Sequence, residues 1–468
     1  MSAQESIPTP FGRVLPRCHP AVRPRTGAAL RDTAGSVLRA GGRGPGTASP
    51  ARMVLGWLIV CLMLAVPAAD AQLEVGVARA EFELPRHVPL AGYSRRGGKP
   101  SQGIHDPVGV RALVLRDGSM VAAVVSCDLL IIDEHLFDAV NGRLREAGLP
   151  PSLVLLLAAT HTHSGPGAYG SRFLEKISMG HFDPDVFDAI VRRIAQTVQQ
   201  AFHDLGPADT AYRTAQTNGL VVNRMDPHGP VENAVVVSAF FRHGQAAPFA
   251  VVVSFSAHPT TLGAWNMQLS ADYPGVLVRA VERQVPGATC LFLAGSVGDQ
   301  APAKSGDRFE RAERIGGPLA EQVVKLLTGI APEPPGTLSA QLMRAVLPPA
   351  QVRLGHRICP RWLGRLLVDD DATLSLITVG RTVLFGMPCD VSAALGDSLQ
   401  AAASVRGLHP IVVGFANDYI GYCVPPSLYV EKQYESSMAF NGPNAGQQLV
   451  DQLIRMLDHT RVGGATSP

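Results

Sequence analysis

The feature that most constrains the fold is an apolar run that ends in two histidines. Leu153–Ala158 is apolar throughout, which is typical of a strand inside a sheet. It leads into Thr160-His161-Thr162-His163, and Ser164-Gly165-Pro166-Gly167 then turns the chain. If the strand continues through the histidines, its period of two residues places both side chains on one face. Because open α/β sheets bind ligands at the carboxyl ends of their strands, the segment predicts a metal or catalytic site. The alternative is one structural and one exposed histidine.

Polar side chains follow four further predicted strands at the point where each strand ends. The strands are 249–255, 290–294, 383–385 and 410–415, and they are followed by His258, Asp299, Asp390 and the segment Asn417–Tyr422, in that order. Chance would scatter such residues along the chain. Their repeated position after buried runs favours one shared site.

Strand and helix patterns alternate along most of the chain. Turn signals at Asp117-Gly118, His243-Gly244 and Gly380-Arg381 predict three hairpins. Apolar spacing of three and four residues predicts helices at 133–147, 184–205, 272–284, 308–327, 391–402 and 447–457. The pattern predicts an α/β fold with mixed β-sheets and flanking helices, in a single catalytic domain of residues 72–468.

The first 71 residues differ from the rest of the chain. Residues 1–52 form a leader rich in Arg, Gly and Pro, with eight Arg against one Glu and one Asp. Residues 53–71 have a positive flank, an apolar core and the small-residue ending Ala69-Asp70-Ala71, which predicts a signal peptide cleaved after Ala71. The apolar core is too short to span a bilayer. We therefore expect a secreted or periplasmic protein, with Met53 as the initiator and the leader as an artefact of start-site choice.

Charge and cysteine content exclude two classes of function. Without residues 1–71 the chain carries 33 Lys and Arg against 36 Asp and Glu and shows no basic stripe, so nucleic acid is not an expected partner. Five cysteines remain, and their scattered positions predict no disulfide framework. The absence of any Cys-x-x-Cys pair argues against a thiolate zinc knuckle.

The residues at the strand ends include the donor types of a catalytic zinc site. His161 and His258 offer imidazole nitrogens and Asp390 offers a carboxylate. Tyr422 would bind largely as phenolate, which the charge of the metal favours. Each residue also has an ordinary structural alternative: His258 could cap a strand, Asp390 could N-cap a helix that starts at Val391, and Tyr422 could belong to the core.

Six short motifs then occur in the order found in neutral ceramidases. They are Thr160–Gly167, Asn223-Arg224, Ala257–Thr260, Asp272–Gly275, Gly298-Asp299 and Asn417–Tyr434. On these motifs the chain resembles the neutral/alkaline non-lysosomal ceramidase family, from about Leu73 to Leu457.

The resemblance implies a set of roles for individual residues. It implies His161, His258, Asp390 and Tyr422 as zinc ligands, and His163 and Arg224 as catalytic residues that hold the substrate amide and its developing charge. The implied reaction is attack of zinc-activated water on an N-acyl amide, as in the hydrolysis of ceramide. The expected partners are a lipid or N-acyl amide substrate and, peripherally, a membrane.

Three departures from the family pattern keep other functions open. The family's active-site serine is replaced by Ala301, and Asp390 stands where the family usually has a glutamate that is one methylene longer. We also expect no C-terminal β-sandwich domain. The alternatives are a zinc esterase or amidase that acts on another substrate, and a family member without catalytic activity.

Overall fold

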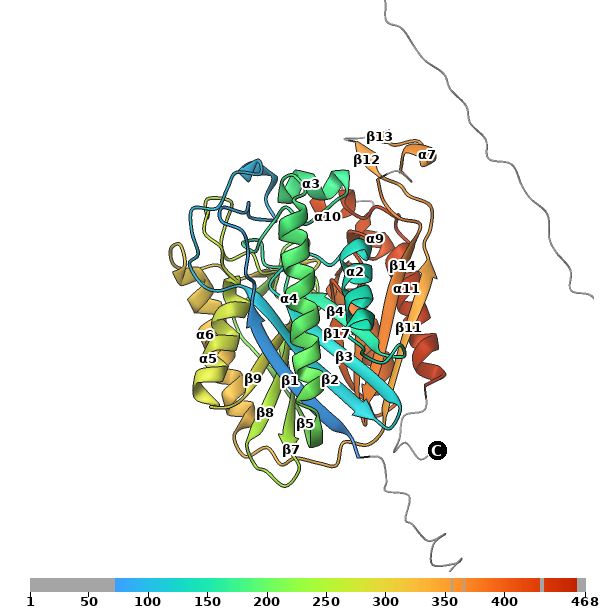
Figure 1. Ribbon diagram of the computed structural model, residues 1–468. Helices are drawn as coiled ribbons and strands as arrows, with labels where there is room; N and C mark the ends of the chain where they lie inside the picture. Colours follow the sequence, from blue (N-terminus) through green and yellow to red (C-terminus); the bar gives the residue numbers. More distant parts are fainter. Residues whose placement is uncertain (1–71, 355–356, 365–366, 430–432, 461–468) are drawn as a thin grey trace, which may run out of the picture. The chain divides into compact units, whose positions relative to one another are not determined.

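Two β-sheets packed face to face form the centre of the fold (Figure 1). The larger sheet has the strand order β4-β3-β2-β1-β5-β7-β8-β9. Its strands are β1 (Glu74–Glu81), β2 (Gly109–Asp117), β3 (Met120–Cys127), β4 (Val154–Ala159), β5 (Gly206–Gln216), β7 (Ala234–Arg242), β8 (Pro248–Phe255) and β9 (Thr289–Ala294). Most neighbours are antiparallel, whereas β3–β4 and β8–β9 are parallel, so the sheet is mixed.

The smaller sheet has the order β11-β14-β15-β17, and only its β15–β17 pair is parallel. Its strands are β11 (Leu338–Val346), β14 (Asp371–Val379), β15 (Thr382–Gly386) and β17 (His409–Val413). Three short pairs complete the strands: β6 (Val221–Asn223) with β10 (Gln300–Pro302), β12 (Arg353–Leu354) with β13 (Arg357–Ile358), and β16 (Asp390–Val391) with β18 (Tyr422–Cys423).

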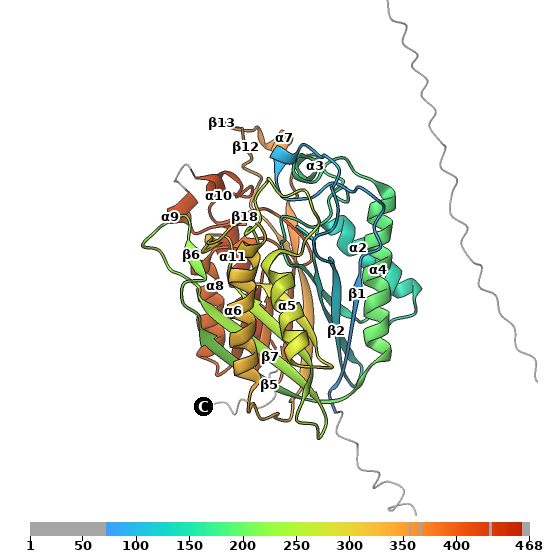
Figure 2. The same ribbon diagram turned by 90° about the vertical axis from the view of Figure 1, so that its left-hand side faces the viewer.

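Helices cover the outer faces of both sheets (Figure 1 and Figure 2). The larger sheet is covered by α2 (Glu134–Glu146), α4 (Pro184–His203), α5 (Asp272–Gln284) and α6 (Glu310–Leu327), and the smaller sheet by α8 (Ala393–Ser404) and α11 (Ala445–Asp458). Short helices lie in the connections: η1 (Ser94–Arg96), α3 (Phe173–Met179), α7 (Arg361–Gly364), α9 (Pro426–Tyr429) and α10 (Tyr434–Ser437).

The longest of the described helices, α4, illustrates how the sequence places these layers. Asp183 caps its first turn by accepting a hydrogen bond from the backbone N–H of Asp185, and Pro184 occupies the first helical position, where its missing N–H costs nothing. Ile190, Ile194 and Val198 follow at four-residue spacing and are buried against the larger sheet. Burying each of these side chains stabilises the packing of the helix on the sheet by about 1.5–3 kcal/mol.

The structure is a computed structural model that describes residues 72–354, 357–364, 367–429 and 433–460, all within the unit Pro67–Pro468. The predicted leader and signal peptide lie outside these residues. Among the helices in the described part of the chain, none is long and apolar enough to cross a bilayer. The five cysteines predicted to form no disulfide framework are all free and buried.

The predicted fold class is confirmed, and so are the three hairpins, seen as β2–β3, β7–β8 and β14–β15. The expectation that the strand before the histidines continues through them is wrong, because β4 ends at Ala159. Sequence reasoning also missed β5, β11 and α3. In β5 and β11 several exposed polar residues break the alternation that would mark a strand. The helix α3 has only seven residues, which is too short to show a helical period in the sequence.

Candidate metal centre

The predicted site residues come together because the two edges of the larger sheet approach each other. β4 and β9 are opposite edge strands, yet they are in contact, and β17 of the smaller sheet packs against β8 and β9. A bridge between Ala158 and Ala416 joins the end of β4 to the segment that follows β17. The carboxyl ends of four strands, β4, β8, β15 and β17, therefore surround one point.

His161 reaches this point from a strained loop. Its φ angle is +62°, in the left-handed region that residues other than glycine rarely adopt. Such a conformation costs about 1–3 kcal/mol and persists only where its surroundings hold it. Here the ring stacks on Phe415 with 3.8 Å between centroids, and its Nδ1 lies 2.6 Å from the carbonyl oxygen of Leu130. The loop, and not a continued strand, orients this histidine.

Three imidazole rings converge on one another at their Nε2 atoms. The Nε2 of His161 lies 2.9 Å from that of His258, and the Nε2 of His163 lies 3.2 Å and 3.1 Å from those two atoms. His161 and His258 are buried and His163 is partly buried. Three nitrogen atoms so close together are able to hold one metal ion.

The protonation of two of these rings favours a cation between them. The Nδ1 of His161 faces the carbonyl of Leu130, and the Nδ1 of His258 lies 3.4 Å from the carbonyl of Val297, so we assign the ring proton to Nδ1 in both. Burial lowers the pKa of His161 to about 3 and holds that of His258 well below its ordinary value. Both rings are therefore neutral and point Nε2 lone pairs at each other, an arrangement that a bound metal ion stabilises. Neutral imidazole suits several transition metals.

Asp390 lies beside the three rings. Its Oδ1 is 3.7 Å from the Nε2 of His161 and has no hydrogen-bond partner among the described residues, although the side chain is fully buried. Burial raises the pKa of Asp390 to about 7, and a nearby cation would favour its ionised form. Tyr419 donates a hydrogen bond to the other oxygen, Oδ2, at 2.8 Å. Asp390 does not N-cap a helix, because α8 begins at Ala393 with Ser392 at its N-cap.

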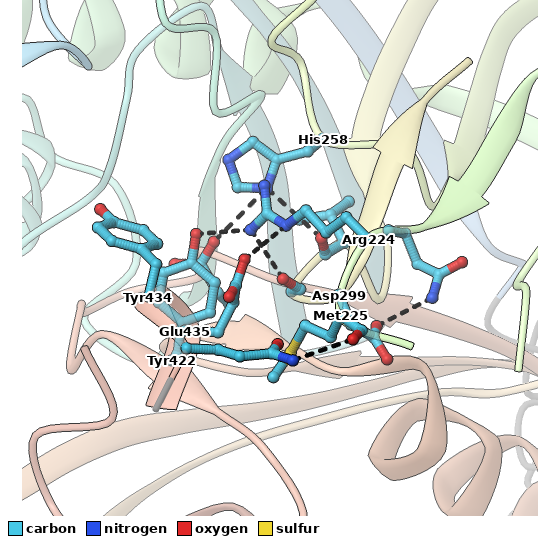
Figure 3. Close-up of polar contacts among 12 residues, drawn as sticks. Arg224, Met225, His258, Asp299, Tyr422, Tyr434 and Glu435 are labelled. Carbon is cyan, nitrogen blue, oxygen red and sulfur yellow. Dashed lines mark hydrogen bonds and ion pairs between the residues drawn. The ribbon is translucent and has the colours of Figure 1, made fainter. Parts of the chain in front are cut away.

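Arg224 forms a second group of contacts next to the histidines (Figure 3). Its Nη2 donates to the hydroxyl of Tyr422 at 2.9 Å and to the carbonyl of Gly298 at 2.8 Å. Its Nε pairs with Oε1 of Glu435 at 2.8 Å. Burial alone would lower the pKa of this guanidinium, but Tyr422 and Glu435 outweigh burial and raise it. Figure 3 shows Tyr422, Glu435 and Tyr434 gathered around the arginine.

Register places Tyr422 directly beside Asp390. The two residues are paired across the short parallel strands β16 and β18. Burial and the neighbouring Asp390 raise the pKa of the Tyr422 phenol well above its ordinary value even though Arg224 donates to it, so the hydroxyl stays protonated unless a metal ion binds beside it. Tyr422 is thus the register neighbour of Asp390 and accepts a hydrogen bond from the guanidinium of Arg224.

The structure brings together all six residues predicted for the site. His163 was predicted to hold the substrate amide, but its Nε2 is also available as a third imidazole donor beside His161 and His258. Ligand and catalytic roles for the six residues stay predictions. Asp299, which also follows a strand, has a structural role: its Oδ1 accepts hydrogen bonds from the backbone N–H of Ala393 and from the side chain of Gln300.

Sequence reasoning missed four residues that support the site. Phe415 stacks on His161, Tyr419 holds Asp390, Glu435 pairs with Arg224, and Arg96 donates to the carbonyl of His163 at 2.6 Å. Tyr419 lies inside the strand-end segment Asn417–Tyr422 and could have been singled out there. The other three carry no signal in the sequence, because only the fold brings them to the site.

Ala301 lies in β10, close to the histidines. The preceding residue, Gln300, accepts a hydrogen bond at its carbonyl from the backbone N–H of His258, at 3.0 Å. Ala301 itself pairs with Val222 of β6. Position 301 is therefore next to the metal centre, and the alanine leaves no hydroxyl there. A separate cleft of about 1060 Å³, lined by residues 81–87 and 101–108, does not include the three histidines.

Comparison with known proteins agrees with this geometry. The family model for the N-terminal part of neutral/alkaline non-lysosomal ceramidases matches residues 74–314. A neutral ceramidase of Mycobacterium tuberculosis is 24% identical, over 75% of this chain and 71% of its own length. A neutral ceramidase of Pseudomonas aeruginosa is 22% identical, over 88% of this chain and 76% of its own length.

Two solved structures have the same fold. The crystal structure of the Pseudomonas aeruginosa neutral ceramidase superposes with a TM-score of 0.73 at 21% identity, and covers 85% of this chain and 77% of that one. A structure described as ceramidase complexed with C2 gives a TM-score of 0.74 at 20% identity, with the same coverage.

Proposed function

This chain belongs to the neutral/alkaline non-lysosomal ceramidase family, and from that premise we propose that it hydrolyses the amide bond of ceramide or of a closely similar N-acyl lipid. The curated relatives are neutral ceramidases, which are hydrolases of an amide bond. The observation that carries the proposal is the convergence of three buried imidazole nitrogens, 2.9–3.2 Å apart, beside Asp390.

Zinc is the metal we propose for this centre. His161 and His258 would hold it with Asp390 and Tyr422, and the unpartnered Oδ1 of Asp390 and the facing Nε2 lone pairs fit that assignment. Bound there, zinc supplies Lewis-acid chemistry that activates water for attack at neutral pH. The adjacent Tyr419 hydroxyl keeps the Asp390 carboxylate in position.

Arg224 and His163 would act on the substrate. The guanidinium of Arg224 is held by Glu435 and by the carbonyl of Gly298, so it is positioned before the substrate arrives. A preorganised donor of this kind stabilises a developing oxyanion by about 3–4 kcal/mol in known hydrolases. His163 would donate a proton to the leaving amine. The alternative for His163 is to orient the neighbouring imidazoles.

Ala301 favours a second candidate function. A serine-dependent reaction cannot run at this position, so the chain would be an esterase or amidase for another substrate, or a binding protein that retains the fold. The proposed metal-dependent reaction does not need that serine, because water is the nucleophile. Hydrolysis of the ceramide amide bond by the unmodified chain would therefore support the metal-dependent reaction, and its absence would favour one of the alternatives.

Metal dependence is tested on the purified full chain. We expect about one zinc per chain and loss of amide hydrolysis on chelation. His161→Ala should lose both metal and activity, whereas His243→Ala, an exposed histidine away from the site, should retain both. Full metal content and activity in His161→Ala would show that the metal assignment is wrong.

Substrate class is tested by assaying ceramide, N-acyl amino acids and simple acyl esters side by side. Turnover of ceramide supports the proposal, and turnover of a soluble ester without ceramide favours the esterase. Activity that appears only in Ala301→Ser would identify a binding protein with a degenerate site.

We also propose that the chain is exported and processed after Ala71. The support is the charge and apolar pattern of residues 53–71. N-terminal sequencing of the secreted protein should begin at Gln72. Recovery of residue 1 would contradict both the cleavage and the start-site prediction.

A further inference from the structure

An exposed apolar and basic surface lies at the same end of the fold as the metal centre. In both Figure 1 and Figure 2, α3, β12, β13 and α7 lie together at this end. The short helix α3 exposes Phe173, Lys176 and Ile177, which share one face at three- and four-residue spacing. Ile358 of β13 and Trp362 of α7 are also exposed. We call these five residues the α3–α7 rim.

The α3–α7 rim is held in place by packing and ion-pair contacts with the rest of the fold. On its inner side, Leu174 of α3 packs against an apolar cluster that includes Val352 and Cys359. Arg172, the N-cap of α3, forms an ion pair with Asp369. The apolar side chains that point outward are nevertheless large: Phe173 is 66% exposed and Trp362 is 69% exposed. Exposed aromatic residues held on a rigid support are typical of a binding surface.

The charge around the rim is positive. Arg95 and Lys99 are exposed in and after η1, which contacts α3, and Lys176 lies on α3 itself. Among the described residues, none of these three cations forms an ion pair with a carboxylate. The acidic Asp369 is already paired with Arg172.

The rim connects directly to the metal centre through η1. Tyr93, the N-cap of η1, places its ring 4.9 Å from the ring of His163. Arg96, the last residue of η1, donates to the carbonyl of His163. The segment that carries Arg95 and Lys99 at the surface therefore also holds a site histidine in place.

We propose that the α3–α7 rim, with Arg95 and Lys99, docks the protein on the surface of an anionic phospholipid bilayer. Trp362, Phe173 and the two isoleucines would enter the interface, and the cations would contact lipid phosphates. A second copy of the chain is a poorer occupant, because a two-fold dimer through this surface would bring like charges together. The inference rests on the proposed function in one respect, namely that the substrate is an N-acyl lipid held in a membrane. Docking through the rim would let such a lipid pass from the membrane to the site without crossing water.

Vesicle sedimentation tests the surface independently of catalysis. The full chain should bind phosphatidylcholine vesicles that contain phosphatidylglycerol about tenfold more strongly than pure phosphatidylcholine vesicles, and high salt should weaken that preference. The double variant Phe173→Ser/Trp362→Ser should lose at least about tenfold in binding. Val405→Ser replaces an apolar residue that is 81% exposed at the end of α8, outside the rim, and should bind like the unmodified chain.

Charge and folding controls complete the experiment. Lys99→Glu/Lys176→Glu should remove the preference for anionic vesicles, since both side chains are exposed and unpaired among the described residues. Unchanged thermal unfolding would show that the variants fold, and hydrolysis of a soluble short-chain N-acyl amide should be unaffected. Vesicle binding by a chain that hydrolyses no amide would refute the proposed function and leave the docking surface standing. Equal binding by both rim variants and the unmodified chain, no binding to either vesicle, or a dimer that the rim variants dissociate would overturn the docking proposal.

Discussion

Arg96 offers the sharpest test of how the fold holds the metal centre. Its side chain is 3% exposed, and no carboxylate of the described residues pairs with it. Instead the guanidinium donates to four backbone carbonyls: to Ala91 and His163 at 2.6 Å, to Asn266 at 3.0 Å, and to Gly263 at 3.3 Å. Burial lowers the pKa of Arg96 to about 10, so it remains charged at neutral pH.

Arg96→Met should therefore destabilise the protein strongly. A hydrogen bond from a charged donor contributes about 1.5–3 kcal/mol, and three of the four bonds are 3.0 Å or shorter. The substitution also removes a buried charge, and because burying that charge was unfavourable, its removal offsets part of the lost hydrogen-bond energy. We expect the free energy of unfolding to fall by about 4 kcal/mol. Arg96→Lys should recover less than half of it, since one ammonium group cannot reach carbonyls on opposite sides.

The measurement is urea unfolding at a fixed free metal concentration, together with metal affinity. Because Arg96 holds the backbone of His163, Arg96→Met should also weaken metal binding by about tenfold or more. Arg116→Met is the matched control: Arg116 is partly exposed, pairs with Glu74, and should cost less than about 1 kcal/mol. A loss below about 1 kcal/mol in Arg96→Met would refute the reasoning, because the freed carbonyls would then have other partners.

Three further predictions concern other parts of the structure. Tyr419→Phe should weaken metal binding about 10–100-fold without unfolding the chain, as measured by competition with a chelator, because it frees Oδ2 of Asp390. Burial and the neighbouring Asp133 raise the pKa of Glu175 to about 7, so the free energy of unfolding should fall as pH rises from 4.5 to 7. Glu175→Gln, which stays neutral, should remove that fall and gain up to about 3 kcal/mol at pH 8, and an unchanged pH profile of urea unfolding would contradict this. Gly76→Ala would bring a Cβ within 2.0 Å of a backbone oxygen of α4. We therefore expect the free energy of unfolding, followed by thermal unfolding, to fall by about 1–3 kcal/mol or more. Equal stability would show that α4 can move away.

Local patterns predicted most of the elements that frame the site. The predicted helix 272–284 coincides with α5, and the three hairpins have the predicted partners. This succeeds because burial on one face imposes a period on the sequence, and the period is local. Elements with weak periodicity, such as β5 and α3, were missed for the same reason.

The order of residues along the chain also determined which side chains could meet. His161, His258 and Asp390 each follow a strand, and strand ends gather at one edge of a sheet. A resemblance based on short motifs added the roles of His163 and Arg224. All of this information is contained in neighbouring residues and their spacing.

Only the tertiary structure decided how these side chains are held. The left-handed backbone of His161, the third imidazole nitrogen from His163, and the supporting contacts of Tyr419 and Glu435 depend on residues far apart in the sequence. They arise because β4 and β9, at opposite edges of one sheet, approach each other and the smaller sheet closes against them. Such long-range contacts leave no local period in the sequence, so the sequence determined which residues could form the metal centre, and packing decided their geometry.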